Sequence, residues 1–114
     1  VERGITRLKE AKAQGVHALI ATDNVADGFY PYGSYDLLET YALGVQAAHL
    51  NPADAWLSSI TTEPANAMNL QWDGKIEVGC PADFIVLAAR SSYELITPAG
   101  RQRRVMRAGK FLTV

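Results

Sequence analysis

The feature that most constrains the fold is the apolar segment from Val16 to Ala21, which is interrupted only at His17. A strand with one face in water alternates apolar and polar residues. An uninterrupted apolar strand is instead covered on both faces, as in a parallel sheet flanked by helices. Residues 2–14 have apolar side chains at helical spacing, and Gly15 suits the left-handed position that ends a helix. Because helix, short loop and buried strand are the repeating unit of α/β proteins, we predict an α/β fold.

Further helices are predicted after a polar loop at residues 25–33 that is rich in glycine and aromatic residues. Ser34 is expected to cap a helix that runs to Leu50, because a serine hydroxyl accepts hydrogen bonds from the first free amides of a helix. A second helix is expected to begin at Asn51, since the proline that follows it is favoured at the first helical position. A third, shorter helix is predicted over residues 62–70.

Beyond residue 72 the pattern becomes all-β. Alanine and glycine at positions 108 and 109 are expected to form the turn between the last two strands. We therefore divide the chain into an α/β part, residues 1–72, and a β part, residues 73–114. The predicted strands cover residues 76–78, 84–87, 102–107 and 110–114.

Each part lacks partners that its pattern requires. The buried strand has no parallel neighbour in the sequence, and roughly forty residues of strand bury too little apolar surface to be stable alone. The chain also begins without an initiator methionine or a signal-peptide pattern. We therefore expect an incomplete fold, namely the C-terminal segment of a longer protein whose missing N-terminal part completes it.

Composition excludes several classes of partner. The formal net charge of −1 argues against binding to nucleic acid or to an anionic membrane surface. No apolar run approaches the roughly 18 residues needed to cross a bilayer. The single cysteine, Cys80, excludes an internal disulfide and predicts a reducing, cytoplasmic location.

Asp23 is the first candidate for chemistry, because it directly follows the predicted strand and opens the loop. The carboxyl ends of parallel strands carry the functional groups of α/β barrels and open sheets. A carboxylate there can bind a metal through one oxygen and accept a proton from water through the other. The alternative is that Asp23 only caps the loop or a neighbouring helix, and its position alone leaves both interpretations open.

The other titratable candidates are expected to be structural. His17 lies at the start of the predicted strand, away from its Asp23 end, and is expected to be packed and hydrogen-bonded. His49 lies near a helix C-terminus, where a cation suits the helix dipole. Cys80 has no neighbour that would activate its thiol. The two histidines do not make a metal site by themselves.

Two clusters have competing interpretations. The basic run at residues 101–104 is interpreted as a solvated strand edge rather than a nucleic-acid contact. Phe29, Tyr30, Tyr32 and Tyr35 crowd one loop, where they can wall a pocket for a flat substrate or form a hydrophobic plug over the end of the sheet. The sequence leaves both alternatives for the aromatic residues open.

Several segments, in the right order, resemble bacterial cytosine deaminases and their relatives in the amidohydrolase superfamily. Residues 20–25 and 27–34 resemble the last barrel strand and its loop, and residues 62–70 are similar to the helix that follows the barrel. Residues 74–87 fit the run G-x-I-x-x-G-x-x-A-D-hydrophobic that leads into the small β-sandwich of these enzymes. The resemblance covers nearly the whole chain.

The resemblance implies the C-terminal end of a distorted (β/α)8 TIM barrel followed by part of a small β-sandwich. It also implies one divalent metal ion, zinc or iron, in the full-length enzyme. Asp23 occupies the place of the family's catalytic aspartate, which is a metal ligand and shuttles protons. The remaining metal ligands and a catalytic glutamate would precede Val1, so the segment alone is expected to bind no metal and to be inactive.

Asn24 and Phe29 stand at positions that bind substrate in the family, where a second acid and a tryptophan are frequent. The implied reaction is hydrolysis of a non-peptide C–N bond by metal-activated water, most simply the deamination of cytosine or a related cyclic amidine or aminotriazine. The implied partners are this small cyclic nitrogen compound and further copies of the protein in a homo-oligomer.

Two alternatives without catalysis stand beside this hypothesis. The chain can be an interaction module that reuses a barrel end as a scaffold, which predicts a compact monomer with a cooperative melt. It can also belong to a relative whose upstream metal ligands have decayed, which predicts a protein that binds no metal.

Overall fold

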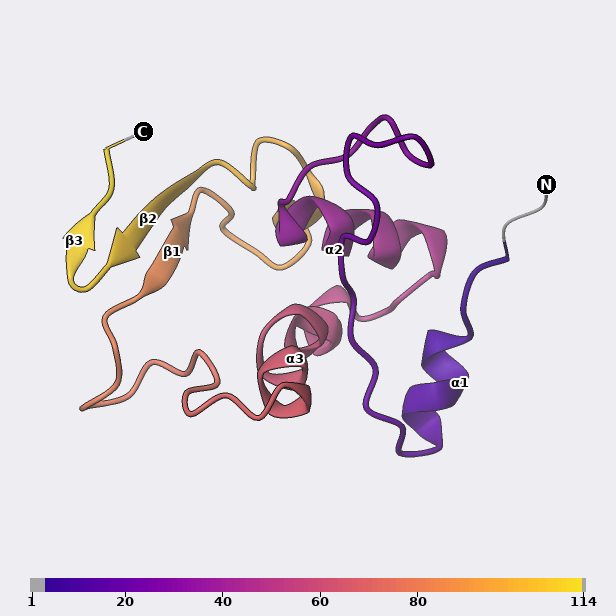
Figure 1. Cartoon of the computed structure of the whole chain (residues 1–114), viewed down its shortest axis with the longest axis horizontal. Coiled ribbons are helices and arrows are strands. Elements are labelled where there is room, and N and C mark those ends of the chain that lie inside the picture. The colour runs from indigo at the N-terminus through magenta and orange to yellow at the C-terminus, as the bar shows by residue number, and fades with distance from the viewer. Residues whose placement is uncertain (1–3, 114) are drawn as a thin grey trace.

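The computed structural model describes residues 4–113 and combines short helices with a small antiparallel sheet. The helices gather in one part of the molecule and the sheet lies at the other end, as Figure 1 shows. No helix of the described residues combines the length and the apolar character needed to span a bilayer. In chain order the elements are α1 (Leu8–Ala13), α2 (Leu37–Ala47), the 3-10 helix η1 (Ala53–Ile60), α3 (Thr62–Ala67), β1 (Phe84–Leu87), the 3-10 helix η2 (Glu94–Ile96), β2 (Arg103–Arg107) and β3 (Lys110–Phe111).

The segment predicted as a buried strand is extended but unpaired. It follows α1, whose end at Gly15 has the expected left-handed backbone with φ 77°. The segment runs past the helices without joining the sheet (Figure 1), and Ile20 N–H donates to the Ser59 carbonyl at 3.0 Å. Ala18 and Ile20 are half-buried, whereas Leu19 is exposed. Helices therefore cover one face, and the prediction that both faces are buried is wrong for this chain.

Helix α2 forms the centre of the core. Its Tyr41 is fully buried, and the Tyr41 hydroxyl donates to the Ala53 carbonyl at 2.5 Å, which ties α2 to η1. Burial raises the pKa of the Tyr41 phenol. The cluster continues through further buried side chains of α2, of the link that follows it, of η1 and of η2, which are Val45, Leu50, Ala53, Trp56 and Leu95.

The predicted start of α2 is corrected by the structure. Asp36, rather than Ser34, is the N-cap, and its Oδ1 accepts the Leu38 N–H at 3.0 Å. Ser34 lies two residues earlier, where its hydroxyl accepts the Asp36 N–H at 3.2 Å and donates to Glu39. Both residues therefore hydrogen-bond near the helix start, but only Asp36 satisfies a first-turn amide of α2.

The next two predicted helices exist with different bounds. Residues 53–60 form a 3-10 helix whose N-cap is Pro52, because Pro52 has an extended backbone and cannot be the first helical residue. Helix α3 ends at Ala67 rather than near Leu70. Asn69 takes a left-handed φ of 52°, and the Leu70 N–H donates to the Ala65 carbonyl at 2.9 Å. These two features terminate the helix.

The sheet has the order β1-β2-β3 and is antiparallel throughout. The predicted strands at 84–87 and 102–107 are confirmed, with the second beginning at Arg103, and the third ends at Phe111. Ala108 and Gly109 both have positive φ, as the turn between β2 and β3 requires. Strand β2 is the central strand, but β3 pairs only with its Met106 and Arg107, so Arg103 and Arg104 pair with β1 on one side alone.

The strand predicted at residues 76–78 is absent. This stretch contains no assigned strand, and Ile76 and Val78 are among the most exposed apolar side chains of the described residues. A strand needs a neighbour for its backbone N–H and C=O groups, and residues 4–113 do not place one beside this stretch. The apolar residues of the pattern therefore have no sheet face to pack on.

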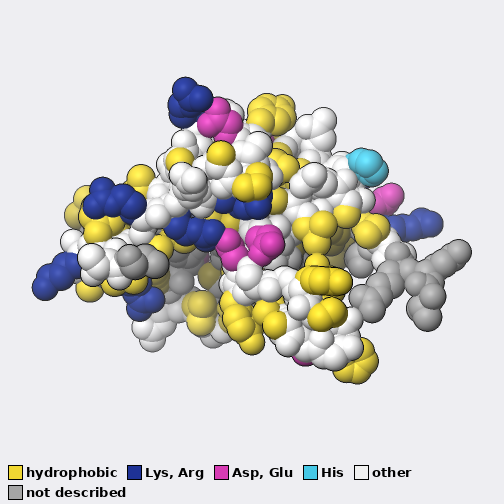
Figure 2. Space-filling model, turned by 90° about the horizontal axis from the view of Figure 1, so that it is seen from above, with side chains coloured by type: hydrophobic (Ala, Val, Ile, Leu, Met, Phe, Trp, Pro, Cys, Tyr) yellow, Lys and Arg dark blue, Asp and Glu magenta, His cyan; other side chains and the backbone are white. Residues whose placement is uncertain are grey.

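Much apolar surface lies outside the core. Among the described residues, 18 large apolar side chains are exposed and nine apolar residues are buried. Figure 2 shows apolar side chains in several patches over one face of the molecule. Exposed apolar surface on this scale is typical of faces that pack against further protein.

An ion pair joins the helical part to the sheet. The Arg103 Nη1 on β2 donates to the Asp36 Oδ1 at 2.9 Å, and Nη2 donates to Oδ2 of the same carboxylate. The hydrogen bond from Arg103 holds the pKa of Asp36 below its usual range. The pair links residues far apart in the sequence at the N-terminus of α2.

Candidate functional site

Asp23 lies where the extended segment ends and the loop begins. Its backbone is left-handed with φ 54°, a conformation that aspartate adopts more readily than most residues and that turns the chain away from the extended direction. The side chain is exposed, and its carboxylate accepts no hydrogen bond from the described residues. Both carboxylate oxygens are therefore free to bind a cation or a proton.

The loop after Asp23 is organised by Asp27, a residue that was not predicted to be functional. The Asp27 Oδ1 accepts the backbone N–H groups of Phe29 and Tyr30, each at 2.9 Å. Its Oδ2 accepts the Asn24 Nδ2 at 2.7 Å. The N–H of Tyr30, followed by the Asn24 and Phe29 donors, holds the pKa of Asp27 below its usual range. An aspartate followed by glycine is a known turn signal, so Asp27 was recognisable from the sequence.

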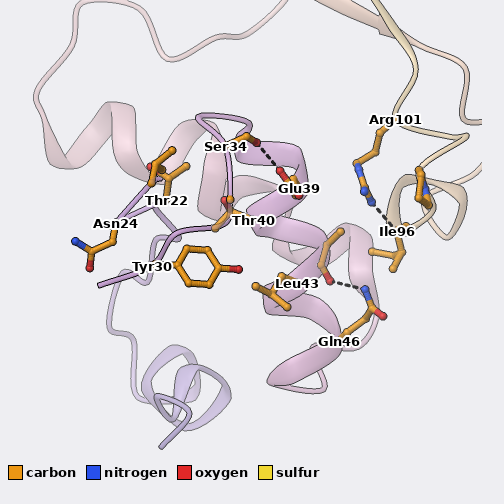
Figure 3. A pocket seen from close by; sticks show the side chains of 14 residues that line it. Thr22, Asn24, Tyr30, Ser34, Glu39, Thr40, Leu43, Gln46, Ile96 and Arg101 are labelled. Atoms are coloured by element: carbon orange, nitrogen blue, oxygen red, sulfur yellow. Dashed lines mark hydrogen bonds between the residues drawn. The ribbon is translucent and has the colours of Figure 1, made fainter. Parts of the chain in front are cut away.

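The aromatic residues of the loop divide into two groups. Tyr30 and Tyr32 meet edge to face with ring centroids 5.8 Å apart. Phe29, Tyr32 and Tyr35 are exposed, so they form no hydrophobic plug over the extended segment. Tyr35 lines a pocket beside β1, and Tyr30, the least exposed of the four aromatic residues, lines another pocket between the loop and α2 (Figure 3).

This pocket has a volume of about 430 Å³ and lies between the loop, α2 and the chain around η2. Its wall is polar in part, with Ser34 bonded to Glu39 and with Arg101 Nη1 donating to the Ile96 carbonyl at 2.8 Å, as Figure 3 shows. Asn24 lines the pocket, whereas Asp23 and Phe29 do not. The structure therefore does not gather the three predicted site residues in one cavity.

The histidines lie away from Asp23 in their contacts. The His17 Nδ1 is 2.8 Å from the Glu63 Oε2, so it is hydrogen-bonded as predicted, but its side chain is 85% exposed rather than packed. His49 follows the end of α2 with a left-handed φ of 52°. Cys80 is a partly buried free thiol.

The described residues do not hold a metal ion by themselves. No group of three or more His, Cys, Asp or Glu side chains within residues 4–113 is arranged to bind one. The free, exposed carboxylate of Asp23 fits one position in the coordination shell of a divalent cation, since such ions take carboxylate oxygens as ligands. A metal centre that includes Asp23 needs its other ligands from elsewhere.

Comparison with known proteins identifies the family. The sequence pattern of the amidohydrolase family matches residues 1–112. The chain belongs to the amidohydrolase family. It is 38% identical over 111 residues to a pterin deaminase of Rhizobium rhizogenes, which covers 96% of this chain and 25% of that protein. It is 28% identical over 111 residues to the N-isopropylammelide isopropyl amidohydrolase of Pseudomonas sp., with coverage of 95% and 27%.

A solved structure in the amidohydrolase family has the same fold over this region. The 5-methylcytosine deaminase of Klebsiella pneumoniae, solved with phosphonocytosine and with 5-fluorocytosine, superposes with a TM-score of 0.80 at 27% identity. The match covers 95% of this chain and 27% of that one. The chain thus spans about a quarter of the length of the relatives it matches. The predicted resemblance to cytosine-deaminase-like amidohydrolases is confirmed.

Proposed function

We propose that this chain forms part of the active site of a metal-dependent hydrolase that deaminates a cyclic nitrogen compound. The observation that carries the proposal is the Asp23 carboxylate, exposed and without a hydrogen bond from the described residues, at the exit of an extended segment. The family and the similarity to deaminases support this assignment. Within it, residues 1–72 form the last α/β unit of the barrel with its trailing helices, and residues 73–114 form strands of the β-sandwich.

The open face of the extended segment supports a place in a barrel wall. Ala18 and Ile20 face the helices, whereas Leu19 and Ala21 are exposed and Asp23 follows them at the same alternation. In a (β/α)8 barrel the helices cover the outer face of each strand, and every second residue points inward. In such a barrel this alternation would direct Asp23 toward the interior, at the end of the strand where these enzymes place their active sites. The missing neighbours would come from an N-terminal part of the same protein.

Asp23 would serve both as a metal ligand and as a proton carrier. A divalent cation, zinc or iron, supplies Lewis acidity that makes water nucleophilic near neutral pH. The Asp23 carboxylate contributes one ligand oxygen, and its second oxygen can take a proton and deliver it to the departing nitrogen. Proton delivery matters because neutral ammonia or a neutral amine is a far better leaving group than the corresponding amide anion. The other ligands would lie outside the described residues.

Asn24 and Phe29 would select the substrate. The Asn24 amide donates to Asp27, which leaves its oxygen as an acceptor for an N–H group of a cyclic amidine. Phe29 is 78% exposed at the loop, and an apolar ring in that position gains by stacking on a flat heterocycle. Cytosine, pterin and aminotriazine rings all combine a flat face with N–H donors, so these three ring types define the substrate class to test.

The decisive experiment uses the intact protein that carries this segment. We expect bound zinc or iron and release of ammonia or amine from at least one of cytosine, 5-methylcytosine, pterin or an aminotriazine. Asp23→Ala is expected to lose the metal and to lower kcat/KM by about a hundredfold to ten-thousandfold, since it removes a ligand and the proton carrier together.

The matched control is Glu77→Ala, which removes another exposed carboxylate from a turn far along the chain. It is expected to keep metal content and turnover. If Asp23→Ala works normally, the role of Asp23 is wrong. If the intact protein binds no metal and releases no ammonia, the non-catalytic alternatives replace the hydrolase.

A further inference from the structure

We propose that Asp27 is a positioning residue that fixes the substrate-facing atom of Asn24 and the turn that presents Phe29. This proposal rests on the proposed function, because it assigns a task to the same loop. It extends that function by stating which hydrogen-bonding group position 24 offers to the substrate and which residue determines it.

The orientation of the Asn24 amide follows from its partner. The Asn24 nitrogen lies 2.7 Å from the Asp27 Oδ2. An ionised carboxylate only accepts hydrogen bonds, so it is the NH₂ side of the amide that faces Asp27. The Asn24 carbonyl oxygen points away from Asp27 and accepts no hydrogen bond from the described residues. The carbonyl oxygen of Asn24 is therefore left as an acceptor for a ligand, beside the one amide N–H that Asp27 does not take.

The same carboxylate shapes the turn. Its second oxygen accepts the N–H groups of Phe29 and Tyr30 at 2.9 Å, and the Asp27 N–H donates to the Tyr30 carbonyl at 3.1 Å. Hydrogen bonds to an ionised group are shorter and stronger than those between neutral groups. The lowered pKa of Asp27 agrees with an ionised carboxylate across the neutral range. One charged side chain thus holds Asn24 and the backbone of Phe29 in a fixed relation.

An acceptor at position 24 determines which ring edge can bind there. A cyclic nitrogen compound that presents N–H or NH₂ toward Asn24 is favoured. A ring that presents an unprotonated nitrogen or a carbonyl there leaves two acceptors facing each other and is disfavoured. Asp27 sets this preference without touching the substrate.

Exchanging the two side chains tests the proposal in the intact enzyme. In Asp27→Asn the new Oδ1 can still accept from Phe29 and Tyr30, but its NH₂ now faces Asn24, which must turn its oxygen inward and its nitrogen outward. In Asn24→Asp two carboxylates meet and repel. Each single variant is expected to raise KM about tenfold with a smaller change in kcat.

The double variant Asn24→Asp/Asp27→Asn restores the pairing with the roles reversed. The carboxylate at position 24 accepts from the amide at position 27 and again offers an oxygen to the substrate. We expect its KM to return to within about threefold of the wild-type value, which two independent structural defects would not do. Melting temperatures are expected to follow the same order, and metal content is expected to stay at the wild-type level in all three variants.

Asp73→Asn is the matched control, because the Asp73 Oδ1 also accepts a backbone N–H within a turn, that of Lys75 at 3.2 Å, outside the loop. It is expected to leave KM unchanged. A double variant no better than the single variants, or an unchanged KM in Asp27→Asn, overturns the proposal. If the wild-type enzyme binds no metal or shows no turnover, it is the proposed deaminase function that is wrong. The order of the melting temperatures of the variants then still shows whether Asp27 orients Asn24.

Discussion

Gly33 takes a backbone conformation that only glycine adopts without strain. Its φ is 86°, and a Cβ atom added there would lie 2.8 Å from the Tyr30 Cε1. Gly33→Ala therefore strains the backbone and pushes the Tyr30 ring out of the pocket wall. We predict a loss of about 1–3 kcal/mol in the free energy of unfolding, measured by denaturant titration of the intact protein.

The control for this change lies in the same loop. Gly28 has no positive φ and no atom within 4 Å of an added Cβ, so Gly28→Ala is expected to be close to neutral. Equal stability of the two alanine variants would show that the close approach of Gly33 and Tyr30 does not constrain the loop.

The location of a residue was predicted correctly where its position along the chain alone determines that location. Asp23 was placed at a strand exit from the apolar run before it, and it does lie at the end of an extended segment. The parts played by Asp27 and Gly33 depend on atoms several residues away, which meet only after the loop closes. The functional roles of Asp23, Asn24 and Phe29 remain predictions.

Helix α2 depends on Asp36 in two ways. The carboxylate caps the helix through the Leu38 N–H and pairs with Arg103, whose hydrogen bond lowers the pKa of Asp36 from 3.8. Because the pKa is lower in the folded state, the pair stabilises the protein above about pH 4, and this stabilisation is lost as the pH falls through the lowered pKa. Asp36→Asn keeps a capping oxygen and removes the charge. We predict a loss of about 1 kcal/mol in the free energy of unfolding at pH 7 and a weaker dependence of that free energy on pH in the acid range. Denaturant titrations from about pH 7 to pH 2 measure both.

Asp36→Ala separates the cap from the ion pair. It removes the acceptor for Leu38 as well as the charge, so it is expected to cost about 1 kcal/mol more than Asp36→Asn. Arg103→Met is expected to match Asp36→Asn in its loss of acid dependence. If Asp36→Asn keeps the wild-type acid profile, the ion pair does not stabilise the fold.

Strands were predictable where the strands that they pair with lie within the chain. The residues 84–87 pair with β2, and the turn at 108–109 brings β3 to the same strand, so the pattern and the structure agree. The apolar residues at 76–78 gave an equally good strand pattern, yet no strand lies beside them in the described residues. Ser34 and Asp36 are both good capping residues, and only their distance from the first helical amide separates them.

At the scale of the whole molecule, the exposed apolar surface predicts self-association. Leu19, on the open side of the extended segment, is 43% exposed, and Val16, at the start of that segment, is 54% exposed. Met68 and Leu70 add to the uncovered surface. We predict that the 114-residue chain alone forms dimers or larger species, measured by size-exclusion chromatography with light scattering. Replacing Val16 and Leu19 with serine is expected to shift the chain toward monomer.

A monodisperse monomer over a wide concentration range would contradict this expectation and favour the interaction-module alternative. Helices in the first part of the chain and strands in the second were predictable from hydrophobic periodicity, whereas residues 4–113 contain no paired parallel strands and the division at residue 72 stays a prediction. The homo-oligomer stays a prediction.

The contact between Asp36 and Arg103 has a consequence for recombining relatives of this protein. A chimaera that takes residues 73–114 from another amidohydrolase crosses the junction between the helices and the sheet, and it exchanges Arg103 while keeping Asp36. If the donor lacks a cation at that position, Asp36 at the start of α2 loses its counter-ion. Crossover points are therefore best chosen so that both ends of this ion pair come from the same parent.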